Sequence, residues 1–175
     1  AFPRVLEGGT ESDLLPDWVV SDAIKALLRS SSHDSHYIPP IEAFRHQKTA
    51  LKPEGLVPGR PLLITAFDGN PSDGHFFNIY WFDTERRLHL VDSSRVMRPA
   101  ARIWAALLDP LIITQAPAPW HGPSGCGTAA IDDVSLTVGC AFPRLCHEQV
   151  LSWVRDGRVP EDLIRPACQV QPPTR

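Results

Sequence analysis

The residues with the clearest chemical potential lie in a turn-rich segment, Gly122 to Ile131, that contains one cysteine. Cys126 stands between Gly125 and Gly127, at what reads as the first turn of a helix. A thiolate is the nucleophilic form of cysteine, and a helix N-terminus stabilises its charge through unpaired N–H groups and the helix dipole. The two glycines let a substrate and a basic side chain approach the sulfur closely. The segment therefore predicts a reactive cysteine, although a buried, unreactive cysteine in a tight loop would have the same neighbours.

Two earlier segments supply a histidine and an aspartate that could serve such a cysteine. His75 begins an aromatic run that ends at Phe82, and a second strand-like run, from Arg87 to Asp92, follows four polar residues. These runs predict a β-hairpin in which Phe82 pairs with Arg87, so that Asp92 lies opposite Phe77. Since Phe77 and His75 share a face, the carboxylate and the imidazole come within reach of each other. A three-residue loop would put Asp92 on the other face.

Together the three residues have the types needed for nucleophilic catalysis. Asp92 would orient the imidazole of His75, His75 would take the thiol proton, and Cys126 would attack a carbonyl group. The alternative is that Asp92 caps a following helix and that His75 starts a strand by chance.

The remaining pattern predicts helices around a central set of strands. Apolar residues at helical spacing predict four helices, with Asp17 or Ser21 capping the first and Gly157 ending the last: 14–28, 95–108 (interrupted by Pro99), 126–138 and 146–155. Short apolar or β-branched runs predict strands at 62–67, 75–82, 87–92 and 111–114. Residues 33–61 read as irregular chain with a short helix at 41–47. This alternation places the chain in the α+β class.

Length and composition favour one globular domain. The chain has 175 residues, of which 43% are hydrophobic, enough for a sizeable core. We expect residues 1–13 to be a flexible leader, 14–165 to be a single catalytic domain and 166–175 to be a tail. A start at Ala1 rather than methionine suggests a domain cut from a longer protein.

Charge and cysteine content exclude several classes of function. The net charge is −3, and the 17 Lys and Arg residues are scattered, which disfavours a nucleic-acid-binding surface. No run approaches the roughly 18 apolar residues of a membrane span. The four cysteines form no C-x-x-C pair, which disfavours a zinc site or a redox motif. We therefore expect free thiols, no metal, no cofactor, a monomer, and an intracellular location in the cytoplasm or nucleus.

The same residues resemble those of the SUMO (sentrin) proteases, ubiquitin-like-protein-specific cysteine proteases that share their fold with adenovirus protease. The segments His75 to Asp83 and Leu88 to Ser93 are similar to the family's histidine-to-aspartate hairpin. Cys126-Gly127 resembles its Asp-Cys-Gly motif, and Trp18 to Leu27 resembles its N-terminal Trp-Leu-x-Asp-x-x-Ile segment.

This resemblance implies a papain-like cysteine protease fold with a central, mostly antiparallel sheet flanked by helices. It also implies a hydrolase, a deSUMOylase-like thiol protease whose substrate is the di-glycine tail of a ubiquitin-like protein or a similar peptide. In that family, aromatic residues at the positions of Trp18 and Phe76 clamp the tail.

The chain also departs from the family pattern. The position six residues before Cys126 holds Trp120, where the family has a glutamine that donates to the oxyanion. The donor here would be the indole of Trp120, His121, a shifted Gln115, or backbone N–H groups. These departures leave two alternatives open: an acyltransferase that uses the same Cys/His/Asp set, or a catalytically weak binding module of the same fold.

Overall fold

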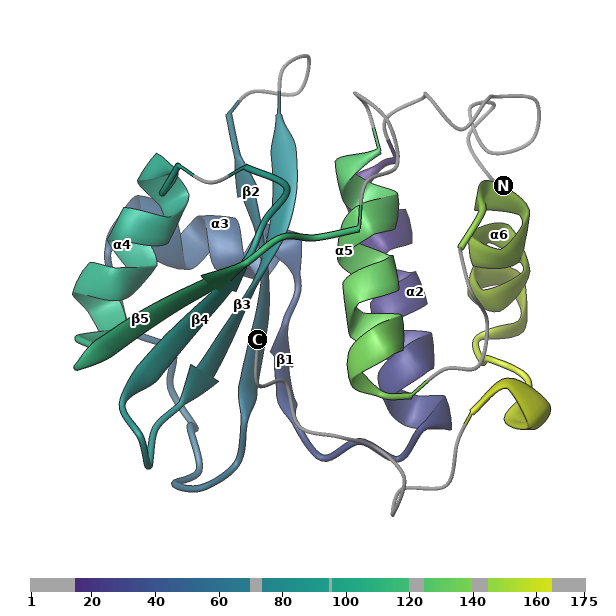
Figure 1. Cartoon of the computed structure of the whole chain (residues 1–175), viewed down its shortest axis with the longest axis horizontal. Helices are drawn as coiled ribbons and strands as arrows, with labels where there is room; N and C mark the ends of the chain where they lie inside the picture. The colour runs from purple at the N-terminus through teal and green to yellow at the C-terminus, as the bar shows by residue number, and fades with distance from the viewer. Residues whose placement is uncertain (1–14, 70–73, 95, 120–124, 140–144, 165–175) are drawn as a thin grey trace. The chain divides into compact units, whose positions relative to one another are not determined.

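The computed structural model describes residues 15–69, 74–94, 96–119, 125–139 and 145–164 (Figure 1). Helices and a five-stranded sheet make up this part of the chain, which confirms the predicted α+β class. The chain forms two compact units, one of residues 34–118 and one that combines the described parts of 1–33 and 119–174. The expected leader and the expected tail both lie outside the described residues, and the single catalytic domain stays a prediction.

The sheet belongs to the unit of residues 34–118. Its strands lie side by side in chain order: β1 (His36–Ile38), β2 (Leu62–Asp68), β3 (His75–Phe82), β4 (Arg87–Val91) and β5 (Ile112–Ala116). The central strand β3 runs antiparallel to both of its neighbours, β2 and β4, as expected. Both edge strands are parallel to their neighbours, β1 to β2 and β4 to β5.

Each parallel pairing needs a crossover connection, and a helix provides it. Helix α3 (Pro40–Thr49) links β1 to β2, and α4 (Pro99–Leu108) links β4 to β5. Both helices begin with proline at the first turn, where the missing N–H costs nothing and the fixed φ angle suits the helix. The predicted helix 95–108 is therefore wrong at its start, because Pro99 begins this helix rather than interrupting it.

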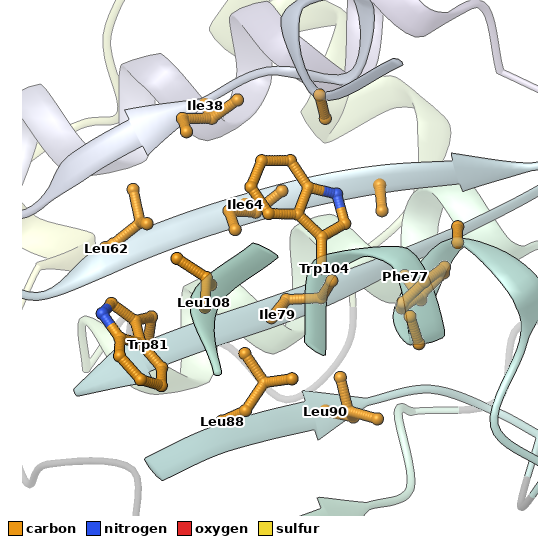
Figure 2. Packing of buried hydrophobic residues seen from close by; sticks show 14 residues of the cluster. Ile38, Leu62, Ile64, Phe77, Ile79, Trp81, Leu88, Leu90, Trp104 and Leu108 are labelled. Carbon is orange, nitrogen blue, oxygen red and sulfur yellow. The ribbon is translucent and has the colours of Figure 1, made fainter. Parts of the chain in front are cut away.

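The core of this unit lies between α3, α4 and one face of the sheet (Figure 1). Trp104 of α4 is fully buried, and Figure 2 shows its indole among aliphatic side chains from the strands. Its Nε1 donates a hydrogen bond to Gln47 Oε1 of α3 across 3.1 Å, so the buried polar atom is satisfied. The other large members of the core are Ile38, Leu62, Ile64, Phe77, Ile79, Trp81, Leu88, Leu90 and Leu108.

The hairpin of β3 and β4 has the predicted register. Phe82 pairs with Arg87 across a loop over residues 83–86, and Asn78 pairs with Val91 further along the two strands. The loop closes with a hydrogen bond from Arg86 N to Asp83 O (3.2 Å), and Arg86 has φ 48°, the left-handed conformation that turns the chain. Continuing this register past Val91 brings Asp92 to the face of β3 that carries His75.

The other unit is helical in its described part. It consists of α2 (Asp17–Ser30), α5 (Cys126–Thr137), α6 (His147–Asp156) and the short 3-10 helix η1 (Glu161–Leu163), with α2 packed against both α5 and α6. Buried residues on α2 recur at helical spacing, from Val19 and Val20 to Leu27. Among the described residues, no helix is long and apolar enough to cross a membrane.

The ends of these helices correct one prediction and confirm another. Pro16 is the N-cap residue of α2, and neither Asp17 nor Ser21 caps it, because both lie inside the helix. Gly157 ends α6 with φ 68°, a left-handed cap that glycine adopts without strain, as predicted. The carbonyl of Gly157 accepts a hydrogen bond from Arg29 Nη2 (2.8 Å), which joins the C-terminal ends of α2 and α6.

Candidate active site

The first and last residues of the hairpin bring an imidazole and a carboxylate together. His75 is the first residue of β3, and Asp92 follows the last residue of β4. His75 Nε2 lies 2.5 Å from Asp92 Oδ1, a short hydrogen bond between groups whose side chains are only 15% and 9% exposed. The contact forms because the register of the hairpin puts both side chains on one face.

This contact also determines which nitrogen of the ring can act as a base. An ionised carboxylate only accepts hydrogen bonds, so the proton between the two groups belongs to Nε2 of His75. In a neutral imidazole the other nitrogen, Nδ1, then carries the lone pair. The dyad of His75 and Asp92 therefore presents Nδ1 as the basic atom.

Asp92 is held by three donors. Besides His75, its carboxylate accepts the backbone N–H of Ser94 at Oδ1 (3.0 Å) and Nε of Arg98 at Oδ2 (2.9 Å). Its backbone is also fixed, since the N–H of Asp92 donates to Ala116 O and the carbonyl of Asp92 accepts the N–H of Ala118. Both backbone bonds attach the end of β4 to the end of β5.

These contacts keep the carboxylate ionised. Burial raises the pKa of Asp92. The hydrogen bonds from His75 and Ser94 and the positive charges of His75 and Arg98 together lower this pKa by more than burial raises it, so the net shift is downward from the ordinary value of 3.8. An ionised Asp92 is the form that accepts the Nε2 proton and stabilises an imidazolium.

The alternative prediction, that Asp92 caps the following helix, is wrong. Helix α4 begins at Pro99, and its N-cap residue is Arg98, so Asp92 lies well before the helix. Its carboxylate accepts the N–H of Ser94 two residues on, as in an Asx turn, and no N–H of α4.

Cys126 lies in the helical unit, as the first residue of α5 after the N-cap residue Gly125. The first intrahelical hydrogen bond runs from Ala129 N to Gly125 O (2.8 Å), which is the predicted start of the helix. Cys126 is buried, with 9% of the residue exposed. Among the described residues, Cys126 and Cys146 are thiols outside any disulfide.

The oxyanion candidates fall in different parts of the chain. Trp120 and His121 lie outside the described residues. Gln115 is an exposed residue of β5 that pairs with Leu90. It lines a small pocket beside Asp92 and Arg98, with Ser94, Met97 and five apolar neighbours completing the wall. A donor role for any of the three stays a prediction.

The two aromatic residues expected to hold a substrate tail differ in exposure. Trp18, near the start of α2, is 39% exposed and so has surface to offer. Phe76 is 3% exposed, and its ring packs against Phe67 with 4.9 Å between the ring centroids. Contact between Phe76 and a substrate stays a prediction, and the residue has little exposed surface for it.

Arg98 is a member of the site that the sequence analysis missed. A signal was present, because an arginine directly before Pro99 would be the N-cap residue of a helix, a position where a cation meets the positive end of the helix dipole. Among the described residues, no group of three or more His, Cys, Asp or Glu side chains could hold a metal ion.

Comparison with known proteins finds similarity at the level of structure, with ten matching chains among solved structures. No protein-family model matches the chain, and no curated protein matches its sequence. Among solved structures, the chain is similar to "SUMO protease Ulp1 with the catalytic cysteine oxidized to a sulfinic acid", with a TM-score of 0.45 and 11% sequence identity. The match covers 75% of this chain and 68% of the other.

Proposed function

We propose that this protein is a thiol-dependent peptidase or isopeptidase of the ubiquitin-like-protease type, with Cys126 as nucleophile, His75 as base and Asp92 as the residue that orients the base. The observation that carries the proposal is the hydrogen bond between His75 Nε2 and Asp92 Oδ1. A buried, ionised carboxylate on one ring nitrogen is what a catalytic histidine needs to present the other nitrogen to a thiol.

In the proposed reaction, Nδ1 of His75 takes the proton of the Cys126 thiol. The thiolate attacks the carbonyl carbon, the C–N bond breaks, and the imidazolium gives its proton to the leaving amine. A thioester remains on Cys126. Water, deprotonated by His75, then hydrolyses this thioester and regenerates the thiol.

The negative charge on the substrate oxygen would be stabilised at the start of α5. The first N–H groups of an α-helix have no intrahelical acceptor, so the backbone around Cys126 is suited to donate to an oxyanion. A side-chain donor from Gln115, Trp120 or His121 would add to this, and losing one such donor typically costs about a hundredfold in rate.

The proposed substrate is the carboxyl-terminal tail of a ubiquitin-like protein or a peptide with small residues before the scissile bond. Gly125 and Gly127 have no Cβ atoms, so a substrate backbone could approach the sulfur closely between them. The exposed indole of Trp18 is a suitable apolar surface for a glycine-rich tail.

An electrophilic probe tests this function directly. A ubiquitin-like protein that ends in a di-glycine electrophile should label Cys126, as located by peptide mass spectrometry, and the label should be lost in His75→Ala. Cys146 is a demanding internal control, because it is a partly exposed thiol at the N-cap position of α6. Equal labelling of Cys126 and Cys146, or labelling unchanged in His75→Ala, would remove the proposal.

The proposal also requires that His75 and Cys126 meet. A His75→Cys variant made with Cys146→Ser should form a disulfide with Cys126 under mild oxidation, detected as a linked peptide pair. A matched control is Arg87→Cys, which places a thiol at the far end of the same hairpin and should give no such pair. Absence of the link in the His75 variant would contradict a shared site.

A further inference from the structure

Arg98 contacts the carboxylate oxygen of Asp92 that His75 does not use. Its Nε donates to Oδ2 across 2.9 Å, while His75 and Ser94 occupy Oδ1. We propose that Arg98 is a positioning residue, whose Nε–H fixes the rotation of the Asp92 carboxylate and so keeps Oδ1 directed at Nε2 of His75. The inference rests on the proposed function for what the oriented ring then does, but the orientation itself can be measured without a substrate.

The hydrogen bonds of Asp92 support this role. Among the described residues, Arg98 is the hydrogen-bond donor to Oδ2, and it is the side-chain partner that opposes His75 across the carboxylate. Without it, the carboxylate can rotate about its Cβ–Cγ bond, so that neither oxygen stays directed at Nε2 of His75. The N–H of His75 would then lose a fixed acceptor, and the proton could move to Nδ1, which abolishes the base.

The place of Arg98 in the fold also needs this explanation. It is the N-cap residue of α4, has extended backbone angles and makes no side-chain capping bond. Serine, threonine, aspartate or asparagine would cap the helix better, and a cation there faces the positive end of the helix dipole. The contact with Asp92 compensates for this unfavourable position, and it keeps three-quarters of the arginine side chain covered.

The positive charge of Arg98 makes His75 a weaker base, whereas the Nε–H donor of Arg98 helps His75 by holding Asp92 in place. A second cation near His75 disfavours the imidazolium through like-charge repulsion. Removing the charge alone would therefore favour proton uptake from the thiol. Removing the Nε–H donor would loosen Asp92 and slow the reaction.

Three variants at Arg98 separate these effects. Arg98→Gln places an amide N–H at the position of Nε without a charge, and Arg98→Met fills the same volume with neither donor nor charge. Arg98→Lys keeps the charge but moves the donor one atom further from the backbone. Arg102→Met, an exposed arginine on the same helix, is the matched control.

The measurements are the tautomer of the His75 ring, from long-range ¹H–¹⁵N NMR assigned with His75→Ala, and the rate of Cys126 alkylation by iodoacetamide. We expect the Nε2–H tautomer in the wild type, Arg98→Gln and Arg102→Met, with rates within about threefold of each other. Arg98→Met should show a mixture of tautomers and a rate lower by roughly ten- to a hundredfold. Arg98→Lys should lie between the Gln and Met variants.

A folded Arg98→Met protein with an unchanged tautomer and an unchanged rate would overturn the inference, and so would a Lys variant that matches the wild type better than the Gln variant does. If Arg98→Met does not fold, the inference is decided by whether Arg98→Gln or Arg98→Lys is closer to the wild type in His75 tautomer and in alkylation rate. The tautomer is read without any substrate, so a protein that labels no electrophilic probe but shows the expected NMR order would refute the proposed function and leave the role of Arg98 standing.

Discussion

Asp92 Oδ1 lies 2.5 Å from His75 Nε2, although the two residues are 17 positions apart in the chain. The distance is set by the pairing of Phe82 with Arg87, which puts the two ends of the hairpin on one face. A shift of the register by one residue would turn Asp92 to the opposite face and break the contact. The geometry of the dyad thus depends on the loop over residues 83–86.

Asp92→Asn should cut turnover by orders of magnitude. An asparagine that keeps its oxygen toward His75 turns its NH₂ group to Nε of Arg98, so that two donors oppose each other. The flipped amide donates to Nε2 and forces the proton of His75 onto Nδ1, the wrong tautomer for a base. We expect a loss of about 1–3 kcal/mol in the free energy of unfolding, because a buried donor is left unpaired in both orientations. Rates and urea denaturation of the variant check this, and full activity would remove Asp92 from the site.

The lowered pKa of Asp92 predicts a specific loss of stability in acid. The carboxyl group titrates near 3.8 in the unfolded chain and lower in the fold, so its ionised form stabilises the protein. This contribution is fully present above about pH 5, and it is lost as the pH falls through the folded pKa. The free energy of unfolding should therefore fall more steeply below about pH 4 in the wild type than in Asp92→Asn. Parallel slopes from urea denaturation would contradict the downward shift.

Gly74→Ala should disturb the start of β3. A Cβ atom at this position would lie 1.7 Å from Cζ of Phe67, so either the ring or the strand must move. Because Gly74 directly precedes His75, we expect a loss of about 1–3 kcal/mol in unfolding free energy, together with slower turnover. Replacing the ring in Phe67→Leu/Gly74→Ala should recover part of both losses. Strictly additive effects of the two substitutions would show that the ring is not the obstacle.

Ser30→Ala should weaken the helical unit without touching the dyad. The hydroxyl of Ser30 accepts the N–H of Val159 across 2.8 Å, and Val159 is buried, so the substitution leaves a backbone donor unpaired. The expected loss is about 1–3 kcal/mol. Ser31→Ala is the control, since that hydroxyl donates only to Leu28 O of its own helix and should matter less. Thermal unfolding of both variants makes the comparison, and equal melting temperatures would show that the bond to Val159 is not stabilising.

The sequence predicts the hairpin and the face that carries His75 and Asp92 because the information there is local. Alternating residues on two strands joined by a four-residue loop determine one register, and the register places His75 and Asp92. The helix start at Cys126 is also local, since glycine precedes an unbroken helical pattern. These features needed no knowledge of distant parts of the chain.

Features that depend on distant partners escaped prediction. Strand β1 has three residues between irregular chain and a proline, and only its parallel pairing with β2 makes it a strand. Arg98 lies only six residues from Asp92, and it was missed because a helix predicted to begin at residue 95 hides the N-cap position that the structure gives Arg98. The start of α4 at Pro99 was ambiguous because proline either begins a helix or interrupts one, and the local pattern fits both.

The most direct test of the central claim is the pH dependence of Cys126 alkylation in a Cys146→Ser background, with and without His75. If His75 activates the thiol, the rate should already be high well below pH 8.5, the approximate pKa of a free cysteine, and in His75→Ala the profile should move up toward that value. If the alkylation rate of Cys126 depends on pH like that of a free cysteine both with and without His75, a catalytic Cys126–His75 pair is contradicted.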